Sequence, residues 1–439
     1  MNFRDDTPFD RTGVVRGDDG IKRYTDRPDS LVHLLRASVE RDRDATAVVE
    51  VGGPSLTYGE LWNRAARVAG GLRATGVGRG DRTAILLPNG AEWVLAFWGI
   101  QLAGAVAVPV NIRFKEAEID YVLEDSGAAY GFRPGERLPD GDPLVTDDLG
   151  PDDLAAIFYT SGTTGFPKGA MTTHANFLSN TETARRVISI PDEPGLRQLV
   201  SVPLFHVTGC NSQLLVACET AGTTVIMPAF EVNAFLDAIV DERIEILTSV
   251  PAIYWLAISQ ERFAAVDTSR VRWLSYGGAP IAPELVRKIK EAFPSARVGN
   301  GFGLTECASI ATYLPHDFAE ARPETVGFAA PVVDVQVADP DPDTGPGELL
   351  IRGPNVVAGY WRKPEQTAET FVDGWLHSGD LARIDVEGLV FIVDRKKDMI
   401  NRGGENVYCV EVENALAACP GVGEAAVVGV PDTMMGEKV

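Results

Sequence analysis

The sequence has 439 residues, of which 45% are hydrophobic and 23% charged, and its formal net charge is -22. This length and composition allow two or three domains with sizeable cores and exclude a globally disordered chain. The acidic excess argues against a nucleic-acid-binding protein and against docking on an anionic membrane, because both depend on Lys and Arg. A phosphate-bearing ligand would therefore need backbone N–H groups and a few placed cations.

The N-terminal 28 residues are polar and without periodicity, which predicts an extended or partly disordered arm. No apolar signal segment follows Met1, so cytoplasm is the predicted location. The cysteines form no CxxC pair, which indicates free thiols in a reducing compartment. They are Cys210, Cys218, Cys307, Cys409 and Cys419.

From residue 29 onward, helical patterns alternate with short apolar runs. Ser30 is placed to cap a first helix, and Thr57 with Glu60 forms a capping box for a second. The segment from Trp93 to Ile112 is about long enough to span a bilayer. Gly104 and Pro109 interrupt it, so it is predicted to be a buried helix near 91–103 followed by a buried strand, with no transmembrane segment. Strands are expected at residues 46–51, 84–87, 105–110 and 128–132.

The same alternation returns after residue 155 and predicts mostly parallel sheet with helices on its faces. Past His316 the chain changes to short runs split by Gly, Pro and Asp, which indicates a smaller β-rich subdomain. The strands expected before that point lie at 155–159, 198–202, 223–227, 246–249 and 273–276.

The strongest motif is Tyr159-Thr-Ser-Gly-Thr-Thr-Gly-Phe-Pro-Lys-Gly169, which follows a buried strand. Its hydroxyls and glycines can wrap phosphate oxygens, and Lys168 adds a point charge. It is not a Walker A loop, because Pro167 stands at the second glycine and Gly169 replaces the Ser or Thr. The plainer alternative is a flexible Ser/Gly turn.

A second glycine-rich patch, Gly299 to Glu306, resembles a dinucleotide fingerprint but has Leu304 in place of its last glycine. Phe302 could stack on a purine, Thr305 could donate to a phosphate, and Glu306 could bind Mg²⁺ through carboxylate oxygen. Taken alone, the patch could equally be a strand-to-helix turn with Glu306 as a first-turn charge.

Three further motifs follow the same order as in a known family: Gly277-Gly-Ala-Pro280, Trp375-Leu-His-Ser-Gly-Asp380 and Asp394-Arg-Lys-Lys-Asp398. With the two patches above, the chain resembles the adenylate-forming superfamily of acyl-CoA synthetases, peptide-synthetase adenylation domains and firefly luciferases. The resemblance runs from about residue 28 to the last residue. Jointly, these motifs are highly specific.

The resemblance implies an α/β fold whose large N-terminal domain, residues 29–393, has two helix-flanked, mostly parallel sheets. A small distorted β-barrel-like subdomain would occupy about 316–393. Residues 394–398, with Lys397 as pivot, would be a hinge. Residues 399–439 would begin a small α+β C-terminal domain that is incomplete in this chain. The family's catalytic lysine would lie beyond Val439, so this form is expected to make acyl-AMP slowly and thioester barely.

The resemblance also assigns roles to residues. The ATP phosphates would contact Thr160, Ser161, Gly162, Thr163, Thr164, Gly165 and Lys168. Adenine would lie against Gly278, Ala279, Pro280, Asn300, Gly301 and Phe302, with Phe302 replacing the usual Tyr. The ribose would bind Asp380 and Arg395, and Mg²⁺ would bind Glu306 and Thr160. Residues acting in catalysis would be Thr305, Glu306, Lys168 and His206. Asp380 could instead be an ordinary turn aspartate, and His206 a core-edge imidazole.

An acyl pocket is implied at His206, Val207, Asn211, Val250, Tyr254, Gly277, Gly303 and Cys307. Small and apolar members suit a hydrophobic acid. The histidines at 33, 174 and 316 lack metal-ligand spacing, so zinc is not supported. Cys409 stands where the family commonly has Pro.

The implied reaction joins a carboxylic acid and ATP into acyl-AMP and pyrophosphate, after which coenzyme A gives acyl-CoA and AMP. Transfer to a carrier protein, luciferase-type oxidation and a non-catalytic nucleotide-binding scaffold are the alternatives. The sequence does not separate fatty, aryl, steroid and terpenoid acids, and it leaves a homodimer open.

Overall fold

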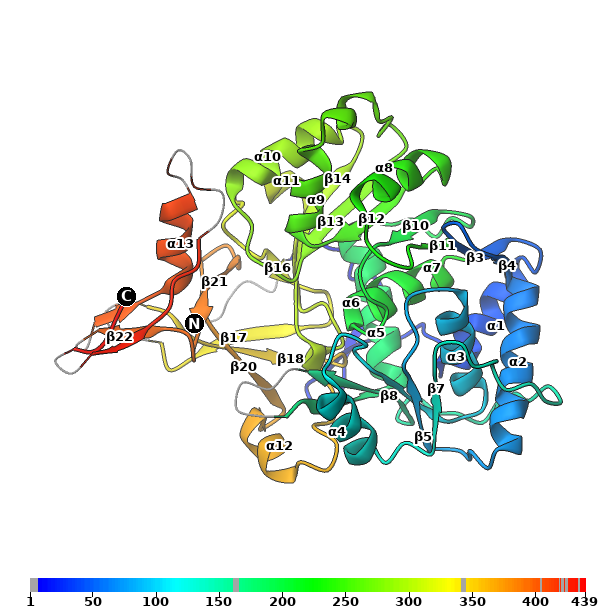
Figure 1. The fold of residues 1–439 in the computed structure, drawn as a ribbon. Coiled ribbons are helices and arrows are strands. Elements are labelled where there is room, and N and C mark those ends of the chain that lie inside the picture. The colour runs from blue at the N-terminus through cyan, green and yellow to red at the C-terminus, as the bar shows by residue number, and fades with distance from the viewer. Residues whose placement is uncertain are drawn as a thin grey trace.

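The computed structural model describes residues 7–160, 166–340, 345–402, 405–417, 419, 422, 425–432 and 435–439. Its first sheet has the order β7-β5-β6-β8-β9, parallel except for β9, which forms an antiparallel hairpin with β8. The strands are β5 (Arg82–Ile85), β6 (Val106–Pro109), β7 (Tyr130–Phe132), β8 (Leu154–Thr160) and β9 (Lys168–Thr173). The nearby helices are α1 (Leu31–Arg41), α2 (Tyr58–Ala74), α3 (Ala91–Leu102) and α4 (Glu116–Ser126) (Figure 1).

The second sheet has the order β16-β15-β14-β13-β12-β10-β11-β3-β4, and its six strands from β14 to β3 are parallel. The strands are β3 (Thr46–Glu50), β4 (Ser55–Thr57), β10 (Arg197–Val200), β11 (Thr223–Ile226), β12 (Ile246–Ser249), β13 (Trp273–Gly277), β14 (Arg297–Phe302), β15 (Thr312–Leu314) and β16 (Phe328–Ala329). The helices are α5 (His174–Ile188), α6 (Val207–Gly209), α7 (Val216–Glu219), α8 (Val232–Asp241), α9 (Pro251–Ile258), α10 (Pro283–Ala292) and α11 (His316–Ala319), with a π-helical turn at Cys210–Leu215 and 3₁₀ turns at Glu261–Ala265 and Thr305–Cys307.

A third, antiparallel sheet follows, and a C-terminal segment protrudes beyond it (Figure 1, yellow to red). The third sheet contains β17 (Asp334–Ala338), β18 (Gly347–Arg352), β19 (Phe371–Val372), β20 (Trp375–Ile384) and β21 (Val390–Arg395), with α12 (Pro364–Thr370) beside it. The C-terminal segment contains β22 (Ile400–Arg402), β23 (Glu405–Val407), α13 (Cys409–Ala417), β24 (Val430–Asp432) and β25 (Gly436–Lys438). The predicted α/β class with two mostly parallel sheets and a β-rich subdomain is therefore confirmed.

Local sequence signals account for several of these elements. Thr57 and Glu60 form the predicted capping box of α2, with both reciprocal hydrogen bonds present. Apart from Glu92, α3 is buried around its whole circumference, which explains its uninterrupted apolar sequence. In the described residues, no helix combines the length and the apolar character needed to cross a membrane. Most predicted strands are found within two residues of their expected ends.

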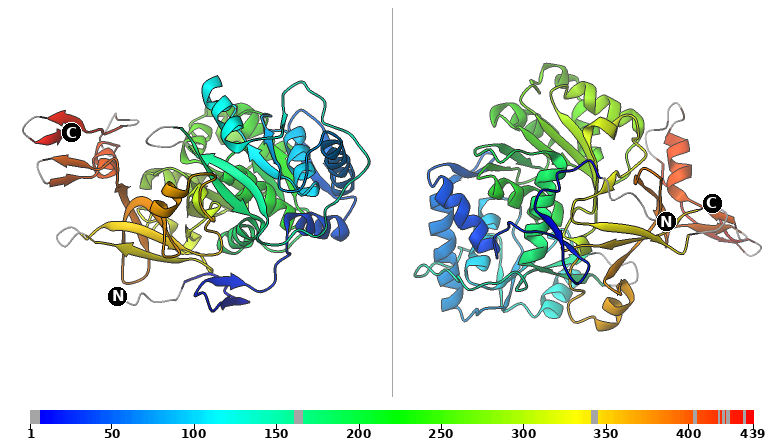
Figure 2. Two further views of the ribbon diagram at one scale, coloured as in Figure 1. Left: turned by 90° about the horizontal axis from the view of Figure 1, so that it is seen from below. Right: turned by 180° about the vertical axis from the view of Figure 1, so that it is seen from behind.

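The N-terminal arm departs from the prediction, because residues 14–24 form an antiparallel hairpin of β1 (Val14–Arg16) and β2 (Lys22–Tyr24). Figure 2 shows this hairpin (dark blue) crossing the back of the large domain. Tyr24 is buried and shares a hydrogen bond of 2.9 Å with Thr183 of α5. Arg16 and Lys22 form ion pairs with Asp334 of β17 at 2.8 and 3.0 Å. These distant partners order a segment whose own composition favours disorder.

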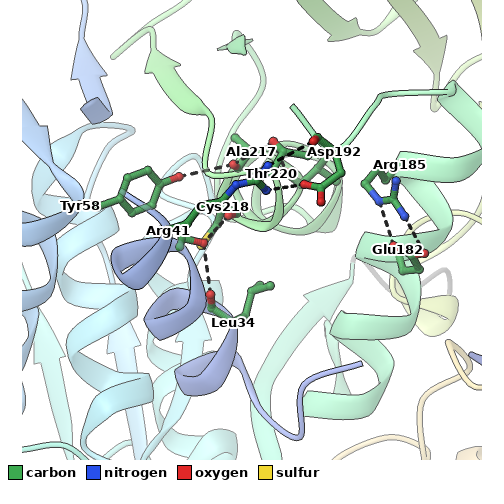
Figure 3. A network of polar contacts seen from close by, with 11 residues as sticks. Leu34, Arg41, Tyr58, Glu182, Arg185, Asp192, Ala217, Cys218 and Thr220 are labelled. Atoms are coloured by element: carbon green, nitrogen blue, oxygen red, sulfur yellow. Dashed lines mark hydrogen bonds and ion pairs between the residues drawn. The ribbon is translucent and has the colours of Figure 1, made fainter. Parts of the chain in front are cut away.

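Figure 3 shows a group of polar contacts in which Cys218 of α7 is held by α1, Arg41 of α1 pairs with Asp192, and Glu182 pairs with Arg185 within α5. Glu182 accepts hydrogen bonds from Arg185 at 2.8 and 3.0 Å and from Arg186 at 2.5 Å. Glu219 faces Glu182, and its Oε2 is buried without a donor among the described residues. Burial and the neighbouring Glu182 charge raise the pKa of Glu219 well above its usual value, so Glu219 carries the proton of this pair.

Replacing Glu219 with glutamine should make thermal stability less dependent on pH. A carboxyl whose pKa is raised in the folded state favours folding below its unfolded pKa and loses that contribution as pH rises. Gln keeps an uncharged donor, so we expect the variant to be more stable than the parent at pH 8 by about 1 kcal/mol or more, and similar at pH 5. Melting temperatures across pH 5–8 test this expectation.

The contrasting variant is Glu182→Gln, which leaves Arg185 and Arg186 without their carboxylate and should be destabilised throughout that range. Parallel pH curves for Glu219→Gln and the parent would contradict the assignment of the proton to Glu219.

Candidate active site

A cleft of about 710 Å³ lies where the ends of β13, β14 and β20 meet the C-terminal segment. Its wall contains all eight residues predicted to bind adenine and ribose, together with the predicted hinge residue Lys397. These are Gly278, Ala279, Pro280, Asn300, Gly301, Phe302, Asp380, Arg395 and Lys397. Residues from the C-terminal segment, including Val410, Val427 and Glu437, close the other side. Segments as far apart in sequence as Gly278 and Glu437 are thus brought together around one space.

Backbone, and not side chain, forms part of the cleft wall. Gly277 pairs with Gly301 across β13 and β14, and a Cβ on Gly277 would lie 2.1 Å from the Gly301 carbonyl oxygen. Gly278 has a φ of +75°, a conformation that residues with a Cβ rarely adopt. Asn300 donates to the Thr325 carbonyl at 3.3 Å. The half-buried Phe302 ring lies at the end of β14. A flat ligand could therefore approach the main chain here.

Asp380 is buried and only partly satisfied. Its Oδ1 forms an ion pair with Arg395 Nε at 2.8 Å, whereas its Oδ2 is buried and has no partner among the described residues. Burial raises the pKa of Asp380 to about 6, with further contributions from the charges of Glu306 and Glu348 and an opposing one from Arg395. An unpartnered carboxylate oxygen in a cleft is costly, so it indicates a place prepared for a donor from outside the protein.

Lys168 and Glu306 come from different sheets and meet at Tyr360. The Tyr360 hydroxyl donates to Glu306 Oε1 at 2.7 Å, and Lys168 Nζ lies 5.2 Å from the centre of the Tyr360 ring. Burial and the Glu306 carboxylate raise the pKa of Tyr360, which keeps the hydroxyl protonated. Sequence reasoning did not single out Tyr360, because no local pattern marks a residue whose partner is 54 positions away.

Thr160 and Lys168 are paired in the β8–β9 hairpin, so the predicted phosphate loop begins and ends in strand. The predicted loop residues Ser161, Gly162, Thr163, Thr164 and Gly165 lie outside the described residues. No group of three or more His, Cys, Asp or Glu side chains suitable for a metal occurs in the described part of the chain. A single carboxylate, Glu306, is nevertheless compatible with Mg²⁺, which commonly takes one or two carboxylates and completes its shell with substrate phosphates.

The model of the AMP-binding enzyme family matches residues 35–142 and 132–361, and the model of the AMP-binding enzyme C-terminal domain matches residues 411–439. The chain belongs to the AMP-binding enzyme family. Its relatives include a feruloyl-CoA synthase of Amycolatopsis sp., 39% identical over 417 aligned positions, with 90% of this chain and 84% of that protein covered. The long-chain-fatty-acid–CoA ligase FadD13 of Mycobacterium tuberculosis is 36% identical, with 87% and 82% covered.

Among solved structures, ATP-bound MatB from Rhodopseudomonas palustris is similar at a TM-score of 0.84 and 32% identity, with 92% of this chain and 87% of that chain covered. These matches confirm the predicted resemblance, the fold class and the prediction of an AMP-binding enzyme.

The turn that follows Glu306 in this AMP-binding enzyme is held by buried polar side chains. Ala308 and Ser309 have φ values of +54° and +122°, which are unfavourable for residues other than Gly. Asn211 Nδ2 donates to the Ala308 carbonyl at 2.5 Å, and Ser212 bonds Ser309 Oγ at 2.8 Å. Asn355 Nδ2 donates to the carbonyls of Cys307 and Ile310 at 3.0 and 2.9 Å. These contacts fix the main chain beside Thr305 and Glu306.

The residues predicted for the acyl pocket differ in their exposure to solvent. Asn211, Tyr254 and Cys307 are fully buried, and Tyr254 donates to the Ser275 carbonyl at 2.8 Å. These three side chains are packed inside the protein and are not exposed to solvent in this structure. Val207 is buried and Val250 partly exposed. Gly277 is the last residue of β13, and Gly303 directly follows β14.

His206 is exposed, and its ring centre lies 4.7 Å from that of Phe205. The surrounding protein and Arg113 lower the pKa of His206, so the imidazole is neutral at pH 7.

Cys409 is buried, and burial together with Asp394 raises its pKa, so this thiol is protonated and unreactive at neutral pH. Its backbone N–H donates to Asp394 Oδ2 at 2.5 Å, which ties α13 to the end of β21. Lys397 lies in the segment that joins β21 to β22, and its side chain is half-exposed.

Proposed function

We propose that this protein is an ATP-dependent carboxylic acid–CoA ligase. A carboxylic acid and ATP give acyl-AMP and pyrophosphate, and the thiol of coenzyme A then displaces AMP to give acyl-CoA. The observation that carries the proposal is the cleft in which a backbone-lined wall faces the buried, unpartnered Oδ2 of Asp380. A nucleoside fits both features, because its base is flat and its ribose presents two hydroxyl donors.

In this proposal adenine lies against the wall formed by Gly278 to Pro280 and Gly301, and Phe302 stacks on the base. Both ribose hydroxyls donate to Asp380, and Arg395 keeps that carboxylate oriented through Oδ1. Thr160 and Lys168 flank the loop of the β8–β9 hairpin, and in this proposal they lie along the phosphates. Thr305 donates to the α-phosphate, next to the fixed turn at Ala308.

Adenylation requires attack of the substrate carboxylate on the α-phosphorus, with pyrophosphate as the leaving group. Lys168 offsets the charge that builds on the leaving phosphates, and the rigid Thr305–Glu306 turn positions the α-phosphate. Glu306, with Thr160 beside it, would hold Mg²⁺, which would supply charge neutralisation on the phosphate oxygens. The neutral, exposed imidazole of His206 would orient the entering carboxylate.

The proposed substrate class rests on the predicted pocket, whose partly exposed members Val250, Gly277 and Gly303 and buried member Val207 are small or apolar. Burying each CH₂ of an acid there would contribute about 0.8 kcal/mol. A hydrophobic acid, either aryl or long-chain, is therefore proposed. Of the two relatives named above, one is a feruloyl-CoA synthase, named for an aryl acid, and the other is a long-chain-fatty-acid–CoA ligase. Residues 29–393 would form the adenylating domain, and the short segment 394–398 the hinge to the C-terminal segment.

The proposal is tested by measuring pyrophosphate release with a panel of aryl and fatty acids, followed by AMP release on addition of free coenzyme A. We expect acid-dependent pyrophosphate release for at least one hydrophobic acid and no release with short polar acids. A phosphopantetheinyl carrier protein, offered in place of coenzyme A, separates the two acceptors. If neither ATP nor a stable acyl-adenylate mimic binds in calorimetry, the proposal is wrong.

A further inference from the structure

Residues 356–363 connect the antiparallel sheet with the first sheet. Met171 N donates to the Gly359 carbonyl at 3.0 Å, and Trp361 N donates to the Gly169 carbonyl at 2.7 Å. Tyr360 consequently forms a bridge with Ala170 of β9, two residues from Lys168. The position of Tyr360 is therefore fixed relative to β9 and to Thr160 and Lys168, which flank the loop of the β8–β9 hairpin.

The same segment also holds Glu306. Val357 N donates to the Glu306 carbonyl at 3.0 Å, and the Tyr360 hydroxyl donates to Glu306 Oε1 at 2.7 Å. Thr367 Oγ1 accepts from Tyr360 N at 2.9 Å, which fixes the backbone of Tyr360. Main chain and side chain of Glu306 are thus both attached to one rigid stretch, and the Tyr360 side chain is buried in the contact.

Tyr360 separates two opposite charges that would otherwise attract each other. Lys168 Nζ lies over the ring face, where the aromatic quadrupole favours a cation, and Glu306 accepts from the hydroxyl at the ring edge. Within the described residues Lys168 forms no ion pair. In a direct Lys168–Glu306 ion pair the two charges would neutralise each other. A ligand would then have to break that ion pair before it could bind either side chain.

We propose that Tyr360 is a positioning residue that keeps Lys168 and Glu306 apart and available to the triphosphate and its cation. This inference rests on the proposed ATP-dependent function. The hydroxyl orients the Glu306 carboxylate, so that its second oxygen remains open. The ring holds the Lys168 ammonium near the phosphates without neutralising it. The two roles belong to different parts of one side chain and can be removed separately.

The test measures ATP binding by calorimetry in the presence of Mg²⁺ and, separately, in excess EDTA. Tyr360→Phe keeps the ring and loses the hydroxyl, so we expect ATP affinity to fall roughly tenfold with Mg²⁺ and to stay unchanged in EDTA. Tyr360→Leu also removes the ring, so affinity should fall in both conditions. The Mg²⁺ concentration for half-maximal ATP binding should rise in Tyr360→Phe.

Tyr58→Phe is the matched control, because its buried hydroxyl donates to the Gly222 carbonyl at 2.7 Å away from the cleft. It should lower the melting temperature without changing the Mg²⁺ dependence. Adding Tyr360→Phe to a Glu306→Gln background should have no further effect on Mg²⁺ dependence if Tyr360 acts through Glu306.

The outcomes are distinguishable. If the unmodified protein fails to bind ATP, the proposed function and this inference both fall. If it binds and Tyr360→Phe weakens binding equally with and without Mg²⁺, or not at all, only the role of Tyr360 is rejected. If Tyr360→Leu does not fold, the role of Tyr360 is still tested by Tyr360→Phe alone and by Tyr360→Phe in the Glu306→Gln background.

Discussion

Replacing Asp380 with asparagine is expected to weaken ATP binding by about two orders of magnitude, because hydrogen bonds to a charged acceptor contribute about 1.5–3 kcal/mol each. Asparagine fills the same volume but offers one acceptor oxygen and places an NH₂ group opposite hydroxyl donors. The buried Oδ2 of Asp380, which has no partner among the described residues, is the atom whose loss matters. Calorimetry with ATP and with an acyl-adenylate mimic measures the effect.

The same variant should be more stable than the parent when no nucleotide is present. Burial raises the pKa of Asp380 to about 6 from 3.8, so the ionised carboxylate opposes folding progressively as pH rises through this interval. At pH 7 the penalty amounts to about 1–3 kcal/mol, which asparagine removes. A higher melting temperature combined with lost ATP binding would show a residue retained for the ligand at a cost in stability.

The ATP affinity of the parent should also depend on pH. Only the ionised carboxylate accepts from both ribose hydroxyls, so affinity should decline as pH falls below about 6, by up to tenfold per unit. Asp380→Asn should lack this dependence.

Asp385→Asn is the matched control on the same hairpin, since Asp385 bonds Arg322 and the main chain of the β20–β21 turn outside the cleft. Equal loss of ATP binding in both variants would contradict the role of Asp380.

Gly303→Ala is expected to abolish adenylate formation and to destabilise the protein by about 3 kcal/mol or more, at the upper end of overpacking effects. A Cβ on Gly303 would lie 1.5 Å from the Ser309 carbonyl oxygen and 2.6 Å from its carbon. The backbone of residues 307–310 cannot shift easily, because hydrogen bonds from Asn211, Ser212 and Asn355 hold it in place. The strain must therefore move the adjacent Thr305–Glu306 turn.

Pyrophosphate release and thermal unfolding measure this effect together. Gly131→Ala is a suitable control, because a Cβ there would meet its nearest neighbour, Leu86, at 3.4 Å, close to ordinary contact, in strand β7 away from the site. A Gly303→Ala variant with the parent's melting temperature and activity would show that the 307–310 turn can shift freely.

Features of this protein that depend on near neighbours were readable from the sequence. The capping box of Thr57 and Glu60, the short buried strands and the buried helix α3 follow from local hydrogen bonds and from the periodicity of apolar residues. The glycine-rich loops were also visible, since only glycine permits the close approach of Gly277 to Gly301. Motif order pointed to the family to which the chain belongs.

Other features were decided by partners far along the chain. The N-terminal hairpin, predicted as an arm, is ordered by Asp334 and α5. Asn211, predicted to line the acyl pocket, has a partner that the sequence does not reveal, the Ala308 carbonyl. The contact of Tyr360 with Glu306 and Lys168, and the unpartnered oxygen of Asp380, are likewise invisible locally. Sequence pattern records which face of a segment is buried, whereas the partner of each buried polar group is set only when separate sheets pack together.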